Sequence, residues 1–97
     1  HTPVIFRLNQ EGNGGTCEPI APSLDNPVQL GPERMIINPG SVGQPRDGNP
    51  LASYAILDME SATLTHRRTA YPIDETQAKM LERDLPLRLV LRLGYGW

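Results

Sequence analysis

The N-terminal part of the chain alternates short apolar runs with Pro- and Gly-rich turns, which is typical of β-strands. Val4, Phe6 and Leu8 stand at alternate positions and therefore share one strand face. The run 51–57 is almost continuously apolar, which predicts a strand buried on both faces. The polar segment 9–26 predicts a loop or a wide hairpin end. Altogether the pattern predicts strands over about residues 3–8, 28–30, 34–37, 51–57 and 62–71.

After Tyr71 the spacing of the apolar positions changes from the period of a strand to that of a helix. Asp74 suits the N-cap of a helix, and Gln77 stands at the capping-box position three residues later. Pro86 suits the first turn of a second helix, which Gly94 would end. The pattern therefore predicts two short helices, over about residues 75–83 and 87–93.

These elements predict an α/β protein in which the helices follow the strands, so that this chain itself is α+β. We expect mainly one antiparallel or mixed sheet followed by the two short helices, as half of a sandwich rather than a closed fold. Ten prolines and nine glycines among 97 residues leave little material for a core. Because the chain also begins at His1 and not at Met, we expect it to be a piece of a longer polypeptide.

Composition narrows the classes of partner. Nine basic and eleven acidic side chains give a formal net charge of −2, which lacks the basic surface that phosphate-backbone binding needs. General nucleic-acid binding is therefore not expected. No apolar run approaches the ~18 residues of a membrane-spanning helix, so no membrane association is expected either. The single Cys17 fits a reducing compartment, and the expected location is the cytoplasm.

The most unusual segment is the loop Asn38–Gly48, with the sequence NPGSVGQPRDG. Its glycines allow consecutive backbone N–H groups to converge into a concave anion site. Ser41 adds a hydroxyl donor, and Arg46 offers a guanidinium that fits a phosphate at two points. The alternative is a long, well-turned connection in which Arg46 is solvated or pairs with Asp47. The segment is neither a Walker loop nor a dinucleotide fingerprint.

Isolated side chains offer few other candidates. His1 stands just before a predicted strand, where an imidazole could serve as a metal ligand, although a terminal histidine is by default an exposed side chain. His66 lies within a predicted strand, and we expect it to be structural or on the surface. Cys17 has no basic neighbour in the sequence, so a catalytic thiol is not expected. No catalytic residue is identified in this segment.

Two stretches carry a resemblance. The opening HTPVI and the run MIINPGSVGQPRDGNPLASYAILD resemble the C-terminal part of calcineurin-like metallophosphoesterases, and above all the bacterial and archaeal branch of phosphodiesterase or diadenosine-tetraphosphatase-like proteins. In that family a Gly-His-Thr-His motif is followed by any residue and then Pro, and His1-Thr2-Pro3 matches the end of this motif. The resemblance implies the C-terminal part of a four-layer α/β/β/α sandwich, over residues 1–97, with the N-terminal half absent.

The resemblance also implies a function for the parent protein. That function is metal-dependent hydrolysis of phosphomonoesters or phosphodiesters, with two divalent ions (Mn, Fe, Zn, Ni or Mg) activating the attacking hydroxide. His1 is the one family metal ligand that remains, and each ion needs about four to six donors, so the segment alone should be inactive. Ser41 and Arg46 are expected to border the substrate. The expected partners are the phosphoester and the missing N-terminal half.

Two other functions remain open on the sequence alone. The first is a non-catalytic domain that binds a phosphate or nucleotide through the loop Asn38–Gly48. The second is a structural module whose exposed sheet face docks another chain.

Overall fold

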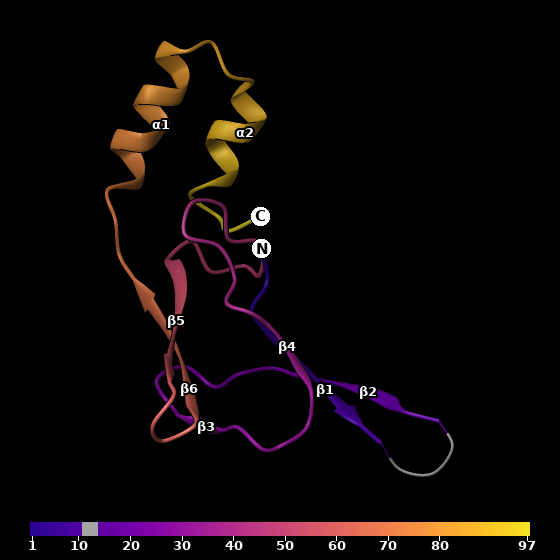
Figure 1. The fold of residues 1–97 in the computed structure, drawn as a ribbon. Coiled ribbons are helices and arrows are strands. Elements are labelled where there is room, and N and C mark those ends of the chain that lie inside the picture. The colour runs from indigo at the N-terminus through magenta and orange to yellow at the C-terminus, as the bar shows by residue number, and fades with distance from the viewer. Residues whose placement is uncertain (11–13) are drawn as a thin grey trace.

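The computed structural model describes residues 1–10 and 14–97. Within these residues the strands come first and the helices last, as Figure 1 shows. The elements are β1 (Val4–Asn9), β2 (Thr16–Ile20), β3 (Val28–Gln29), β4 (Met35–Asn38), β5 (Ala52–Asp58), β6 (Thr63–Thr69), α1 (Ile73–Glu82) and α2 (Leu87–Arg92). The elements that the sequence predicts begin and end within two residues of an observed one.

The strands form two three-stranded antiparallel sheets, with the orders β2-β1-β4 and β3-β6-β5. The predicted α+β class, with antiparallel strands followed by two short helices, is confirmed. The strands divide into two sheets, however, where the sequence suggested mainly one. A physical reason lies at β3, which has only two residues and stands between Pro27 and Pro32. Prolines lack the N–H that a longer ladder needs, so β3 stays short.

Strand β2 is the element that the hydrophobic pattern missed. It lies inside the segment 9–26 and pairs with β1, so that Leu8 stands opposite Cys17 and Ile5 opposite Ile20. Most of β2 is exposed, so its sequence lacks the apolar alternation of a half-buried strand. The described part of this segment thus contains a paired strand, and residues 11–13 lie outside the described part of the chain.

A regular hairpin joins β5 and β6, with Ala52 opposite Thr69 and Asp58 opposite Thr63. The Asp58 carboxylate closes the turn, because its Oδ1 accepts the backbone N–H groups of Glu60 at 2.9 Å and Ser61 at 3.1 Å. The bonds from Ser61 and then Glu60 lower the pKa of the Asp58 carboxyl below its usual value, since they favour its charged form.

The predicted burial of β5 on both faces is wrong for this chain. Tyr54, Ile56 and Leu57 are 38%, 47% and 50% exposed, while Ala52 and Ser53 at the start of the strand are buried. An apolar run predicts that a strand is stable when both of its faces are covered by other parts of the protein. Within the described residues nothing covers the C-terminal end of β5.

The helices pack on each other with little burial. Helix α1 begins at Ile73 after Pro72, so Asp74 lies in its first turn and does not cap it. The side chain of Gln77 donates a 2.8 Å hydrogen bond to the carbonyl of Val90 on α2, which replaces its predicted capping-box role. Helix α1 has no buried residue, and Val90 is the buried residue of α2.

The molecule is extended. Its radius of gyration is 16.7 Å, against about 12.5 Å for a compact domain of this length. Its accessible surface is 6734 Å², against about 5,500 Å² for a compact monomer of this mass. Buried apolar side chains are scattered over both sheets and the helices, namely Ile5, Ala52, Leu64, Val90 and Leu93. No described helix is long and apolar enough to cross a membrane.

Candidate functional site

The loop between β4 and β5 contacts both ends of the described chain, which are marked N and C in Figure 1. The N–H of Arg46 donates to the carbonyl of His1 at 3.1 Å, and the N–H of Gly48 donates to the carbonyl of Gly96 at 2.9 Å. Asparagine side chains close a tight turn at each end of the loop: Asn38 Oδ1 accepts the N–H of Gly40, and Asn49 Oδ1 accepts that of Leu51. The loop is therefore built around specific hydrogen bonds.

His1 is held by this loop. Its Nδ1 lies 2.8 Å from the carbonyl oxygen of Gln44, and because a carbonyl only accepts, Nδ1 carries the proton. In the neutral ring the lone pair then resides on Nε2. A histidine that binds a metal through one nitrogen commonly donates the other N–H to a carbonyl or carboxylate, which fixes the ring and its tautomer. His1 is exposed and so fits one coordination position.

Ser41 and Arg46, the predicted substrate-side residues, both contact Gln44. Ser41 Oγ accepts the N–H of Gln44 at 2.9 Å, and Arg46 Nη2 donates to Gln44 Oε1 at 3.2 Å. Arg46 is exposed and Ser41 half-buried. The structure thus places both residues on the same short loop segment as the carbonyl that holds His1.

Asp47 pairs with Arg68 on β6, and within the described residues no ion pair joins it to Arg46, so of the alternative interpretation only an exposed Arg46 agrees with the structure. Arg68 Nη1 also donates to the carbonyls of Leu51 at 3.0 Å and Asn49 at 3.3 Å. One buried guanidinium thereby ties the end of the loop to the second sheet. Arg68 and Asp47 line a cleft of about 350 Å³ together with His66.

Sequence reasoning missed a buried polar pair beneath the loop. His66 Nε2 lies 2.7 Å from Ser53 Oγ, and Ser53 Oγ donates to the carbonyl of Pro39 at 2.6 Å. Ser53 and His66 are 2% and 5% exposed. Burial, and then the nearby charge of Arg68, lower the pKa of His66, since both disfavour the imidazolium. The available signal was a serine within the apolar run of β5 and a histidine on the inward face of β6.

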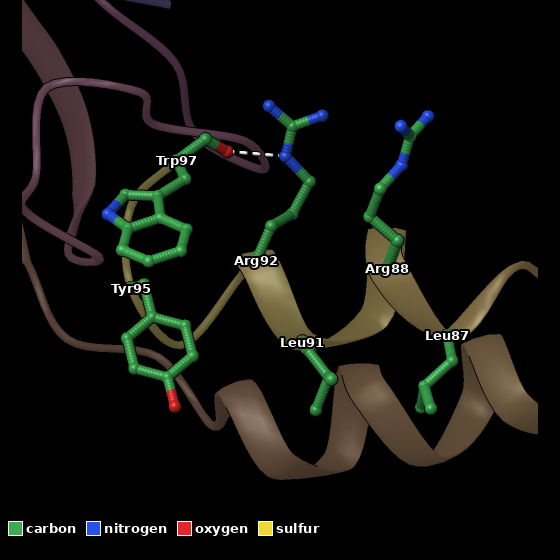
Figure 2. Close-up of a pocket in the computed structure, with 6 residues that line it drawn as sticks. All are labelled: Leu87, Arg88, Leu91, Arg92, Tyr95 and Trp97. Atoms are coloured by element: carbon green, nitrogen blue, oxygen red, sulfur yellow. Dashed lines mark hydrogen bonds between the residues drawn. The ribbon is translucent and has the colours of Figure 1, made fainter.

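A second hollow, of about 710 Å³, runs along α2 and is drawn in Figure 2. It is lined by Leu87, Arg88, Leu91, Arg92, Tyr95 and Trp97. The rings of Tyr95 and Trp97 stack with centroids 5.0 Å apart, and Arg92 Nε donates to the Trp97 carbonyl. Leu87, Leu91, Tyr95 and Trp97 give this lining a mainly apolar character, which suits packing against another surface.

The metal-ligand set is incomplete within the described residues. No three His, Cys, Asp or Glu side chains in that part of the chain lie close enough together to hold a metal ion. Cys17 is a free, exposed thiol on β2. His1 fits one ligand of a metal centre, and the described residues do not by themselves supply the three or more His, Cys, Asp or Glu ligands of a complete site.

The chain is similar to known proteins in both sequence and structure. The chain is 42% identical over 64 residues to an uncharacterized protein of Methanocaldococcus jannaschii, a match that spans 66% of this chain and 26% of that protein. The crystal structure of a metallophosphoesterase from Sphaerobacter thermophilus matches with a TM-score of 0.85 at 42% identity, over 99% of this chain and 39% of that one. No family model matches the chain. The chain thus spans less than half the length of either protein.

Proposed function

We propose that this chain, which belongs to the calcineurin-like metallophosphoesterase superfamily, is part of a metal-dependent phosphoesterase in which His1 is a metal ligand. The observation that carries the proposal is the hydrogen bond from His1 Nδ1 to the carbonyl of Gln44, which leaves Nε2 free to bind. The ring is oriented before any ion arrives, so less conformational entropy is lost on binding.

Two divalent ions at such a site, among Mn, Fe, Zn, Ni and Mg, would neutralise charge on the phosphoryl oxygens and activate a water. The chain's own residues bind and orient. His1 holds its imidazole toward the metal, and Arg46 presents guanidinium donors beyond its single bond to Gln44. Ser41 keeps a hydroxyl hydrogen, because its oxygen accepts from Gln44. We assign Ser41 and Arg46 to the phosphoester substrate.

We further propose that the chain is inactive alone and that the rest of the same protein covers its exposed apolar surface. Three observations support this proposal: the excess accessible surface, the exposed end of β5 and the apolar hollow along α2. Buried apolar surface contributes about 25 cal/mol per Å², so these faces gain most from cover. We place the protein in the cytoplasm, on the ground that its exposed Cys17 suits a reducing compartment.

The proposed function is tested in the longer protein with Mn²⁺ and bis-p-nitrophenyl phosphate. His1→Ala should lower kcat/KM by at least about 100-fold, because the metal centre loses a ligand. The control is Lys79→Ala, an exposed residue of α1, which should leave the rate unchanged. Equal rates for His1→Ala and the unaltered protein would remove His1 from the mechanism. Hydrolysis by residues 1–97 alone would disprove the proposed incompleteness.

The substrate-side assignment has a separate test. Arg46→Gln removes the positive charge and keeps a polar side chain that can donate hydrogen bonds. We expect KM for bis-p-nitrophenyl phosphate to rise about tenfold with little change in kcat, which is the signature of lost ground-state binding. An unchanged KM would show that Arg46 serves only the loop.

A further inference from the structure

A series of hydrogen bonds, connected through the main chain of the loop, leads from the buried His66 to His1, the proposed metal ligand. It begins at His66 Nε2, which lies 2.7 Å from Ser53 Oγ. Ser53 in turn holds the loop at two places: its hydroxyl donates to the carbonyl of Pro39 at 2.6 Å, and its N–H donates to the carbonyl of Ser41 at 2.9 Å. One buried serine thus fixes two main-chain groups of the loop.

The run continues on the other side of the loop. Ser41 Oγ accepts the N–H of Gln44 at 2.9 Å, and the carbonyl of Gln44 accepts from His1 Nδ1 at 2.8 Å. The position of that carbonyl decides the direction in which the His1 ring points. The Ser53 hydroxyl holds Pro39, at the start of the same loop segment, and the Ser53 main-chain N–H holds Ser41. The orientation of His1 therefore depends on a residue that it does not touch.

The protons in the run have one arrangement. Ser53 has a single hydroxyl hydrogen, which goes to the carbonyl of Pro39 because a carbonyl only accepts. His66 must therefore donate from Nε2 to Ser53 Oγ. The pair is directional, and changing either member to an apolar residue leaves a buried polar group without its partner, which is unfavourable.

Close packing supports the same arrangement. Gly40 has a φ of +88°, and a Cβ placed there would lie 2.8 Å from the Cβ of Ser53 and 3.3 Å from Cδ of Pro3. The loop backbone therefore rests directly on the Ser53 side chain. Pro3 is two residues from His1, so the same contact also locates the segment that carries the imidazole.

We propose that Ser53 and His66 are positioning residues for the imidazole of His1: they hold the loop 39–44, whose Gln44 carbonyl orients that ring for metal binding. The proposal rests on the proposed function, in which His1 is a ligand. A positioning role explains why a polar pair occupies a place that apolar side chains of similar size would fill without any desolvation cost.

The test measures Mn²⁺ affinity of the longer protein by titration calorimetry, with the metal alone as probe. Ser53→Ala removes the hydroxyl and adds no bulk. We expect the Kd for Mn²⁺ to rise about tenfold, the lower end of the effect for residues that orient a metal ligand. Ser61→Ala, the same change on the exposed turn between β5 and β6, is the matched control and should leave the Kd unchanged.

A second pair of variants separates positioning from folding. In the variant His66→Gln, the side-chain amide nitrogen takes the place of the histidine Nε2 and can donate to Ser53 Oγ. In the variant His66→Leu, the side chain cannot donate a hydrogen bond. We expect His66→Gln to retain Mn²⁺ affinity within about threefold and His66→Leu to lose about tenfold or more. If Ser53→Ala does not fold, this pair decides the question by itself.

The outcomes distinguish the two proposals. Unchanged Mn²⁺ affinity in Ser53→Ala, or equal affinity in His66→Gln and His66→Leu, overturns the positioning role even if His1→Ala abolishes binding. If His1→Ala also binds Mn²⁺ like the unaltered protein, the proposed function itself is wrong.

Discussion

The loop before β5 and the helical hairpin α1–α2 are held by different forces. In the loop, the main chain is fixed by hydrogen bonds: Ser53 and Arg68 donate to main-chain carbonyls, and the side-chain oxygens of Asn38 and Asn49 accept main-chain N–H groups. In the hairpin, neither helix has a side-chain cap, and Leu81, Leu85, Leu87 and Leu91 are 41–59% exposed. Gln77 makes the side-chain hydrogen bond between the two helices.

This difference distinguishes the loop, which is stabilised by contacts within the chain, from the hairpin, which needs contacts with the rest of the protein. Hydrogen bonds are directional, so the loop keeps one geometry wherever the rest of the protein lies. Apolar burial is not directional and scales with area, so the hairpin gains stability only when something covers it. We therefore expect the loop to respond to subtle changes inside the chain, and the hairpin to respond to the presence of the remaining protein.

Substitutions of three glycines in the loop should lower its stability by different amounts, and the first of them should have the largest effect. Gly40→Ala should destabilise the protein by about 3 kcal/mol, because it adds overpacking against Ser53 to a strained φ. Gly48→Ala should cost only the strain of its φ of +80°, about 1 kcal/mol, since its Cβ meets nothing within 4 Å. Urea denaturation measures both free energies of unfolding.

Gly43 is the matched control for these two variants. Its Cβ would also meet nothing within 4 Å, and its φ lies outside the left-handed region, so Gly43→Ala should change stability by less than about 1 kcal/mol. Equal costs for all three variants would mean that Ser53 does not support the loop at Gly40.

Two neighbouring residues of α2 test the hairpin. Val90 is 2% exposed, and Val90→Ala should cost about 2 kcal/mol in the 97-residue chain because a cavity forms. Leu91 is 51% exposed, and Leu91→Ala should cost under about 0.5 kcal/mol there. In the longer protein the cost of Leu91→Ala should approach that of Val90→Ala. A persistently small cost would show that α2 stays uncovered.

The bond between the helices should matter less. Gln77→Leu keeps the approximate size and removes the donor to the Val90 carbonyl. We expect a loss of about 1 kcal/mol, typical of one partly buried hydrogen bond. Thermal denaturation should show a small drop in Tm, and a rise in Tm would mean that the two helices are held by apolar contact alone.

The smallest expected effect is the pH dependence of stability, because it depends on the protonation of a single imidazole, that of His66. The pKa of His66 is lowered in the folded protein by burial and by Arg68, while Asp47 and Asp25 act in the opposite direction. Below the unfolded value of about 6.5 the unfolded chain therefore binds more protons than the folded one. The free energy of unfolding should fall as the pH drops through about 6.5, and the fall should end below the folded pKa.

His66→Gln is the control, because it does not titrate and should remove this part of the pH dependence. The lowered pKa of Asp58 acts in a separate, more acidic window, since that carboxylate becomes protonated in the folded protein only when the pH falls below the unfolded value of about 4 and through the lower folded pKa. An identical slope at about pH 6.5 in the unaltered protein and His66→Gln would show that another group is responsible.

Local pattern predicted most elements of the fold but not their partners. The alternation in β1 and the helical period after Tyr71 are local properties, so the strands and helices stand close to the predicted ranges. Strand β2 escaped prediction because it is exposed and has no periodic apolar face. The division into two sheets escaped because pairing joins strands far apart in the sequence, as β1 joins β4.

In the candidate site, too, some features follow from the sequence and others only from the tertiary structure. The sequence by itself indicated a resemblance to calcineurin-like metallophosphoesterases, through the loop Asn38–Gly48 and the opening HTPVI, and it suggested His1, Ser41 and Arg46 as candidate site residues. Only the tertiary structure decided that Gln44 holds His1 and that Ser53 and His66 lie beneath the loop. The reason is physical: a motif is a property of neighbouring residues, whereas a hydrogen bond between β5 and β6, or between a loop and a chain end, exists only once the backbone brings distant residues together.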